Sequence, residues 1–153
     1  MRPLAFLGGL SLLLGSIGAR ASAQAPLFGD LHTMIPWDAD PSSAVALGDV
    51  DGDGDLDVVV GNKGTPDRLY RNDGSGVLTP ASGALPAIVN NTRALGLGDL
   101  DGDGDLDLLI GNDGIQDRLY LNNGAGAFSD ATGQFPSFPG PDATRGIALG
   151  DVD

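Results

Sequence analysis

The sequence contains no cysteine and no glutamate, and it has a single histidine. Without cysteine, disulfide bonds, the usual staple of small secreted domains, are excluded. Nucleophile–base pairs and proton shuttles draw on cysteine, histidine and glutamate, so the chain has almost none of the parts that such catalysis needs. His32, the one histidine, is assigned a solvated or packing role. We therefore predict no catalytic residue and no enzymatic activity.

Basic residues are also scarce. Lys63 and seven arginines stand against 21 aspartates, which gives a net charge of −13. Nucleic-acid binding needs clustered lysine and arginine to contact phosphates, so it is not expected for these scattered residues. Twelve of the 21 aspartates lie in three copies of one motif. Because the acidic residues are concentrated in these short motifs, the chain does not have the composition of a disordered acidic tail.

The first 23 residues have the pattern of a secretory signal peptide. Arg2 supplies the positive charge, Leu4–Ile17 is the apolar stretch, and Ala21-Ser22-Ala23 is a small-residue cleavage site. The apolar stretch is shorter than the roughly 20 residues that cross a bilayer. The alternative is a buried N-terminal helix. We predict a signal peptide at 1–23 and an extracellular or periplasmic mature chain with no membrane span.

Residues 24–153 form a repeat region. Ala44–Val77 aligns without a gap to Ala94–Ala127, with 21 identities in 34 positions. The repeat extends upstream, where Phe28, Leu78 and Phe128 are apolar counterparts. These matches divide the region into units at 28–77, 78–127 and 128–153, of which the last is truncated. Because its motif has only begun at Asp151, we expect the working protein to be longer.

Each unit contains signals for four short strands. Apolar runs precede and follow the aspartate motif, an Arg-Leu-Tyr strand comes next, and an Asn- and Gly-rich hairpin turn leads to the fourth strand. The predicted strands of the two complete units cover 44–47, 56–60, 68–71 and 77–79, and 94–97, 106–110, 118–121 and 127–129. Four antiparallel strands in about 50 residues indicate a β-propeller blade. We predict an all-β fold with about two blades and part of a third, in an incomplete ring. Asn and Gly are expected to supply positive φ angles in the turns.

The aspartate motif reads DVDGDGDLD at Asp49–Asp57 and DLDGDGDLD fifty residues later at Asp99–Asp107. Five carboxylates in nine residues repel one another unless a cation lies between them. Ligand-capable side chains stand at motif positions 1, 3, 5 and 9, glycine provides a sharp turn at position 6, and position 7 offers its backbone carbonyl. The predicted metal residues are Asp49, Asp51, Asp53, Asp55 and Asp57, then Asp99, Asp101, Asp103, Asp105 and Asp107, with Asp151 and Asp153 in the third copy.

This spacing matches the first seven positions of an EF-hand loop, but the EF-hand is excluded. Its bidentate Glu at position 12 is replaced by Val60 or Ile110, and the flanking segments are strands rather than helices. The motif between two strands resembles the FG-GAP/VCBS repeat family, in its bacterial secreted type, from Phe28 to Asp153. That resemblance implies an integrin-α-type β-propeller with Ca²⁺ in its hairpin loops. The chain departs from the family pattern in lacking a clear FG…GAP string.

The expected cofactor is Ca²⁺, with one ion for each complete loop and therefore two ions. Oxygen-only ligands do not favour zinc or copper, and Mg²⁺ prefers a tighter octahedral shell that keeps several waters. Mg²⁺ and plain solvated Asp-Gly turns are the alternatives. Because the ion would neutralise the loop and join two strands, folding and metal binding should be linked.

Two functions are consistent with the sequence. The first is a secreted, calcium-binding propeller that acts as a binding or adhesion module for an extracellular protein or carbohydrate. The second is a non-catalytic propeller attached to a secreted hydrolase, whose catalytic domain would lie beyond residue 153. More repeats downstream would favour the first, and a new catalytic domain would favour the second.

Overall fold

The computed structural model describes residues 39–134 and 143–150. The described chain is almost entirely β, with eight strands and one short 3-10 helix, η1 (Thr132–Gln134). The predicted signal peptide at 1–23, the upstream repeat position Phe28, His32, and the third motif copy at Asp151 and Asp153 lie outside the described residues. None of the helical structure in the described ranges has the length and apolar character of a membrane span.

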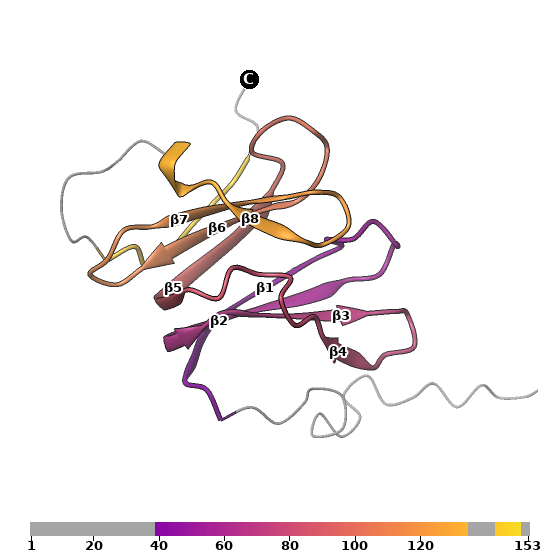
Figure 1. Ribbon diagram of the computed structural model, residues 1–153, viewed down its shortest axis with the longest axis horizontal. Helices are drawn as coiled ribbons and strands as arrows, with labels where there is room; N and C mark the ends of the chain where they lie inside the picture. The colour runs from indigo at the N-terminus through magenta and orange to yellow at the C-terminus, as the bar shows by residue number, and fades with distance from the viewer. Residues whose placement is uncertain (1–38, 135–142, 151–153) are drawn as a thin grey trace, which may run out of the picture.

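The strands form two four-stranded antiparallel units, each paired in chain order (Figure 1). Most strands begin and end close to the predicted ranges, but β2 ends six residues later than predicted and β5 begins five residues earlier. The two units share one register: Val45 opposite Val60 corresponds to Leu95 opposite Ile110. The fold class is therefore confirmed as propeller blades in an incomplete ring. Unit 1 contains β1 (Ser42–Gly48), β2 (Asp57–Pro66), β3 (Arg68–Asn72) and β4 (Leu78–Pro80), and unit 2 contains β5 (Val89–Gly98), β6 (Asp107–Asn112), β7 (Arg118–Asn122) and β8 (Phe128–Asp130).

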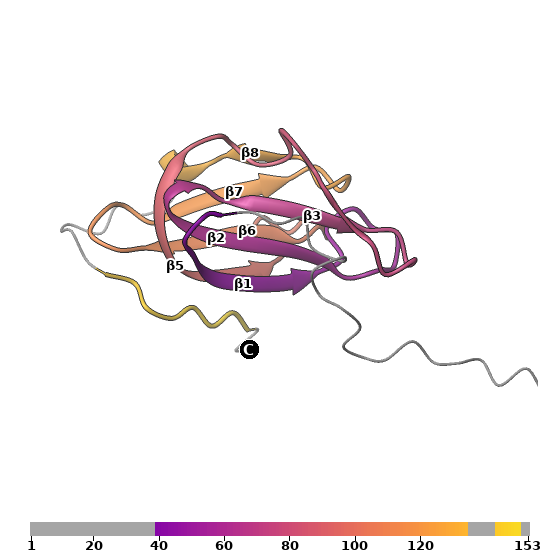
Figure 2. The same ribbon diagram turned by 90° about the horizontal axis from the view of Figure 1, so that it is seen from below.

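The two units are joined where the end of β2 pairs with the start of β5, at Lys63 and Asn91. The bridge between Asp113 and Ala143 repeats this junction toward the third unit. Glycine is required here, because a side chain at Gly61 would collide with the methyl group of Thr92 in the next unit. Figure 2 shows the result from below, with β1 and β8 on opposite sides of the molecule.

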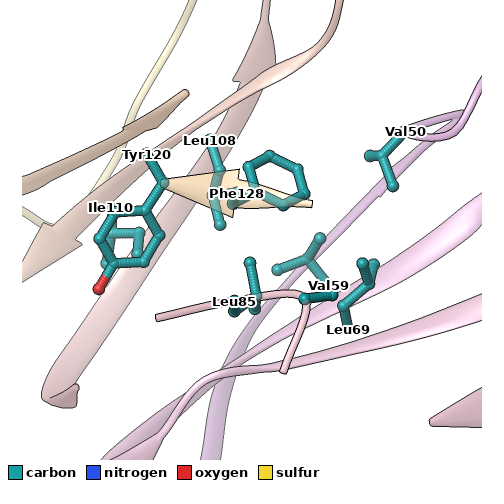
Figure 3. Close-up of a cluster of buried hydrophobic side chains, with 9 residues drawn as sticks. Val50, Val59, Leu69, Leu85, Leu108, Ile110, Tyr120 and Phe128 are labelled. Carbon is teal, nitrogen blue, oxygen red and sulfur yellow. The ribbon is translucent and has the colours of Figure 1, made fainter. Parts of the chain in front are cut away.

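The hydrophobic core lies between the two units (Figure 3). Unit 1 contributes Val59 and Leu69, and unit 2 contributes Leu108, Ile110 and Tyr120. All five side chains are buried. A single blade cannot cover both of its faces, so this shared core makes the stability of each unit depend on its neighbour.

The turns between the third and fourth strands correct one prediction. Every described residue with a positive φ angle is a glycine, among them Gly74 and Gly124. The asparagines contribute in another way: the side-chain oxygen of Asn72 accepts a hydrogen bond of 3.1 Å from the backbone N–H of Gly74. Asparagine therefore stabilises the turn through this side-chain bond, and glycine alone supplies the left-handed backbone.

Candidate metal centres

The two aspartate loops are equivalent hairpin connections. Asp49–Asp57 runs from the end of β1 into β2, and Asp99–Asp107 runs from β5 into β6. Both loops turn sharply at glycines with positive φ, which reaches 95° at Gly54 and 93° at Gly104. The glycine predicted at motif position 6 is thus a backbone requirement, because other residues rarely adopt this conformation.

Three carboxylates converge in each loop. In the first loop they belong to Asp49, Asp51 and Asp57, each of which offers an oxygen within 4.8 Å of the others. The second loop brings its motif positions 1, 3 and 9 together in the same way, at Asp99, Asp101 and Asp107. Of the predicted ligand positions in the described loops, positions 1, 3 and 9 therefore form a group, and positions 5 and 7 are not part of it.

The carboxylate at position 9 is an anchor as well as a candidate ligand. Asp57 is fully buried; its Oδ2 accepts a 3.0 Å hydrogen bond from the N–H of Val50, and its Oδ1 accepts one of 2.9 Å from Asn72. Asp107 repeats both contacts in the second loop, at 2.8 Å and 2.9 Å. Position 9 thus ties the loop to the following hairpin turn, and each oxygen keeps a second lone pair for a cation.

The carboxylate at position 1 organises the loop backbone. Asp49 accepts hydrogen bonds from the N–H groups of Gly52 at 2.8 Å and Gly54 at 2.9 Å. Asp99 accepts the equivalent bonds at 2.7 Å and 3.1 Å. These contacts hold the loop closed around its first carboxylate.

The side chains at positions 5 and 7 are not part of the three-carboxylate groups. Asp53 accepts a 2.9 Å hydrogen bond from the N–H of Asp55. The carboxylate of Asp55 reaches the hairpin turn after β3, where a Cβ at Gly74 would lie 2.6 Å from its Oδ2. Asp105 and Gly124 repeat this approach at the same distance. This approach gives Gly74 and Gly124 a second reason to be glycine besides the turn, because a side chain there would collide with the aspartate.

The carboxyl groups at motif position 3, Asp51 and Asp101, both have raised pKa values. Loss of hydration raises the pKa of the Asp51 carboxyl, the neighbouring carboxylates of Asp57 and Asp53 raise it further, and Arg71 acts against them. The pKa of Asp101 is also raised, first by loss of hydration and then by its acidic neighbours. A divalent cation would relieve this repulsion in both loops.

The residues present fit a hard cation. Each group consists of carboxylate oxygens, which Ca²⁺ and Mg²⁺ prefer. In the first loop, the Oδ1 atom of Asp51 is buried and has no hydrogen-bond partner. A buried carboxylate oxygen without a partner is costly, and a cation bound by the same group would compensate it.

Two contacts at the first loop were not predicted. Unit 2 reaches across to this loop, where Asn122 donates a 2.7 Å hydrogen bond from its side chain to the carbonyl of Val50. Arg71 forms an ion pair with Asp51, with 3.5 Å between Nε and Oδ2. A signal for the second contact was present in the alignment, because position 71 is one of the few at which the two repeats differ in charge.

Comparison with known families agrees with this geometry. The sequence model of the FG-GAP-like repeat family matches residues 49–110 and, in a second match, residues 99–153. Both matches begin at the first aspartate of a loop, Asp49 or Asp99. A search of curated proteins finds no match to the chain.

Proposed function

The chain belongs to the FG-GAP-like repeat family, and we propose that it is a secreted, calcium-binding propeller module without catalytic activity. Its role in this proposal is to bind an extracellular protein or carbohydrate. The observation that carries the proposal is the recurrence of one three-carboxylate group at equivalent positions of two successive units. Each group also contains one buried carboxylate, Asp57 or Asp107, which surface acidic clusters rarely include.

The candidate ligands in the first loop are Asp49, Asp51 and Asp57, and their counterparts fill the same role in the second. Bound Ca²⁺ would supply the positive charge that the crowded carboxylates lack, and its flexible coordination suits a loop that also offers a backbone carbonyl. The carboxylate at position 9 already bonds to the turn after β3. Metal binding at this group would therefore strengthen the contact between the β1–β2 loop and that turn.

A structural role for the ion supports a binding module rather than an enzyme. Among the residues that the structure describes, the acidic side chains that form groups of three are the ones assigned to the cation. General acid–base catalysis needs such groups free to exchange protons. Repeat scaffolds instead present loops from rigid blades, and partners bind at these loops. The predicted signal peptide at 1–23 is the basis for proposing secretion.

Calcium titration of the metal-free full chain tests the proposal. Calorimetry should detect two bound Ca²⁺ ions per chain, one for each complete loop. At a free Ca²⁺ concentration of about 100 times the dissociation constant, the two ions together should raise the melting temperature by about 10 to 20 °C. Excess EDTA should reverse this rise.

Two controls separate specific from general effects. Mg²⁺ at the same concentration should give a smaller rise, because it dehydrates reluctantly. The double variant Asp51→Asn and Asp101→Asn keeps side-chain shape but removes one charge from each carboxylate group, and it should lose most of the Ca²⁺ effect. A wild-type melting curve that is the same in Ca²⁺ and in EDTA would refute the proposal.

A further inference from the structure

The two loops have the same ligand positions but different neighbours at the end of the third strand. Arg71 lies near the end of β3, opposite Thr79, and Leu121 lies at the matching point of β7, opposite Ser129. The pairing register is therefore the same in both units. The two positions differ only in their residue, a cationic arginine in unit 1 and an apolar leucine in unit 2.

Arg71 is held at two points. Its Nε lies 3.5 Å from Oδ2 of Asp51 in the first loop, and its Nη2 donates a 2.6 Å hydrogen bond to the carbonyl of Ala125 in unit 2. Gly126 leaves room for this contact, because a Cβ there would lie 2.8 Å from Nη2. The contact to unit 2 restrains the guanidinium, so that it stays beside the loop instead of turning out into solvent.

The ion pair with Asp51 is one of charge rather than of hydrogen bonding. The Nε atom of Arg71 and the Oδ1 atom of Asp51 are both buried and have no hydrogen-bond partner. The side chains of Arg71 and Asp51 are 38% and 16% exposed, so solvent screens part of their attraction. In the second loop the counterpart of Asp51 is Asp101, and in the part of the chain that the structure describes no ion pair involves it.

We propose that Arg71 is a built-in counter-ion of the first loop, which stabilises its metal-free form and lowers its affinity for a divalent cation. This inference rests on the proposed function, since it concerns the same candidate site. A guanidinium beside one candidate ligand offsets part of the repulsion among the carboxylates when no ion is bound. When an ion is bound, the same positive charge repels it. Among the described residues, no arginine or lysine forms an ion pair with Asp101 in the second loop, so the Ca²⁺ affinity of that loop is not lowered in this way.

Calcium titration with one loop disabled at a time tests this inference. In the full chain, the double variant Asp101→Asn and Asp103→Asn removes two charges from the second loop, so that calorimetry measures Ca²⁺ binding by the first loop alone. In this background Arg71→Leu, which copies the residue of unit 2, should tighten Ca²⁺ binding by about tenfold. Arg71→Lys keeps the charge and should bind Ca²⁺ nearly as the parent does.

The reciprocal change is made in the second loop. With Asp51→Asn and Asp53→Asn disabling the first loop, Leu121→Arg should weaken Ca²⁺ binding, because it places a cation near Asp101. The change should be smaller than that of Arg71→Leu, because the contact to Ala125 restrains Arg71 and not this arginine. The melting temperature of the metal-free chain gives an independent readout. Arg71→Leu should lower it and at the same time enlarge its rise on adding Ca²⁺.

The outcomes distinguish this inference from the proposed function. If the parent with only the first loop intact binds no Ca²⁺, the assignment of that loop as a calcium site fails. If that parent binds Ca²⁺ but Arg71→Leu leaves the affinity unchanged or weakens it, Arg71 is not a counter-ion and the inference is overturned. Should Arg71→Leu fail to fold, Arg71→Gln, which is neutral but keeps a donor for Ala125, should give the same tightening, and an unchanged affinity in that variant overturns the inference equally.

Discussion

The central strands of the two units, β2 and β6, are equivalent in sequence but bury opposite faces. In β6, Leu108 and Ile110 have no exposed surface, and Leu109 between them is half-buried. In β2 the pattern is inverted: Val59, the counterpart of Leu109, has no exposed surface. The residues on either side of it are the half-buried Val58 and Val60.

The inversion follows from the position of each unit in the stack. The face of β2 that contains Val59 looks toward unit 2, and the face of β6 that contains Leu108 looks toward unit 1 (Figure 3). The loops show the same dependence, since Val50 is 2% exposed against unit 2 while its counterpart Leu100 is 39% exposed. Burial in a repeat protein is therefore assigned by the neighbouring unit rather than by the repeat itself.

Two identical substitutions at adjacent positions give the largest test of this comparison. Leu108→Ala should lower the free energy of unfolding by about 2 to 5 kcal/mol, because it opens a cavity in the core shared by the units. Leu109→Ala, on the half-buried face of the same strand, should cost less than about half as much. Urea unfolding of the full chain in EDTA measures both values without a contribution from metal.

Equal costs for the two leucines would break the comparison. They would mean that both faces of β6 are covered in solution, as in the interior of a longer stack. A larger cost for Leu109→Ala would contradict the conclusion that Leu108, rather than Leu109, packs in the core between the units.

The strands and turns could be predicted from the sequence because they are local properties of the repeat. Apolar runs bounded by Gly and Asn indicated where each strand lies. The end of β2 and the start of β5, which pair with each other between the units, were missed by six and five residues. The ungapped alignment agrees with the internal register that the two units share, but it did not predict how the units pair with each other at Lys63 and Asn91. Which face of each strand is buried could not be predicted, because Val58–Val60 and Leu108–Ile110 are apolar at every position.

The candidate metal groups were predictable only in part. Alternate aspartates around Gly54 and Gly104 indicated a cation site by their spacing alone. Spacing does not give side-chain direction, so the turn of Asp55 toward Gly74 appeared only in three dimensions. Arg71 was missed for a related reason, since it follows the motif by 14 residues and reaches it through the pairing of β2 with β3.

A second test compares the polar junctions that follow the two units. Asp67 in unit 1 is buried and accepts hydrogen bonds of 2.8 Å from the N–H of Asn62, 2.9 Å from the side chain of Asn90, and 2.8 Å from the hydroxyl of Thr92. The next residue, Arg68, forms an ion pair with Asp40. At the next junction Asp117 is only half-buried, and it accepts bonds from Asn112 and from Thr144 of the third unit.

The pH dependence of stability tests the burial of Asp67. Burial raises the pKa of Asp67, although its hydrogen bonds and the charge of Arg118 act in the opposite direction. The folded chain therefore binds more protons than the unfolded chain at pH values above the unfolded pKa of about 3.9. The contribution of Asp67 to the free energy of unfolding is largest below pH 3.9, or about that value, and it falls as the pH rises through the pKa of Asp67 in the folded chain.

Asp67→Asn removes this titration. The variant should lose about 1 to 3 kcal/mol of stability at pH 4, because buried donors lose an acceptor, and it should lose less at pH 7. Urea unfolding of the wild type and the variant in EDTA from pH 4 to pH 7 measures the difference, in which the other aspartates cancel. Asp117→Asn is the matched control and should cost less at pH 4. A cost of Asp67→Asn that grows with pH would show that the hydrogen bonds outweigh burial and hold the pKa below its unfolded value.

The smallest expected effect comes from the face of unit 1 that points away from unit 2. Leu47 is 60% exposed, while its counterpart Leu97 packs against the core and lies so near unit 1 that a Cβ at Gly48 would be 2.9 Å from it. Leu47→Ser should change the free energy of unfolding by less than about 0.5 kcal/mol, and Leu97→Ser should cost about 1 to 2 kcal/mol. Urea unfolding at two protein concentrations measures both. Equal costs would mean that a further unit covers Leu47 in solution, and a cost that rises with protein concentration would assign that unit to a second chain.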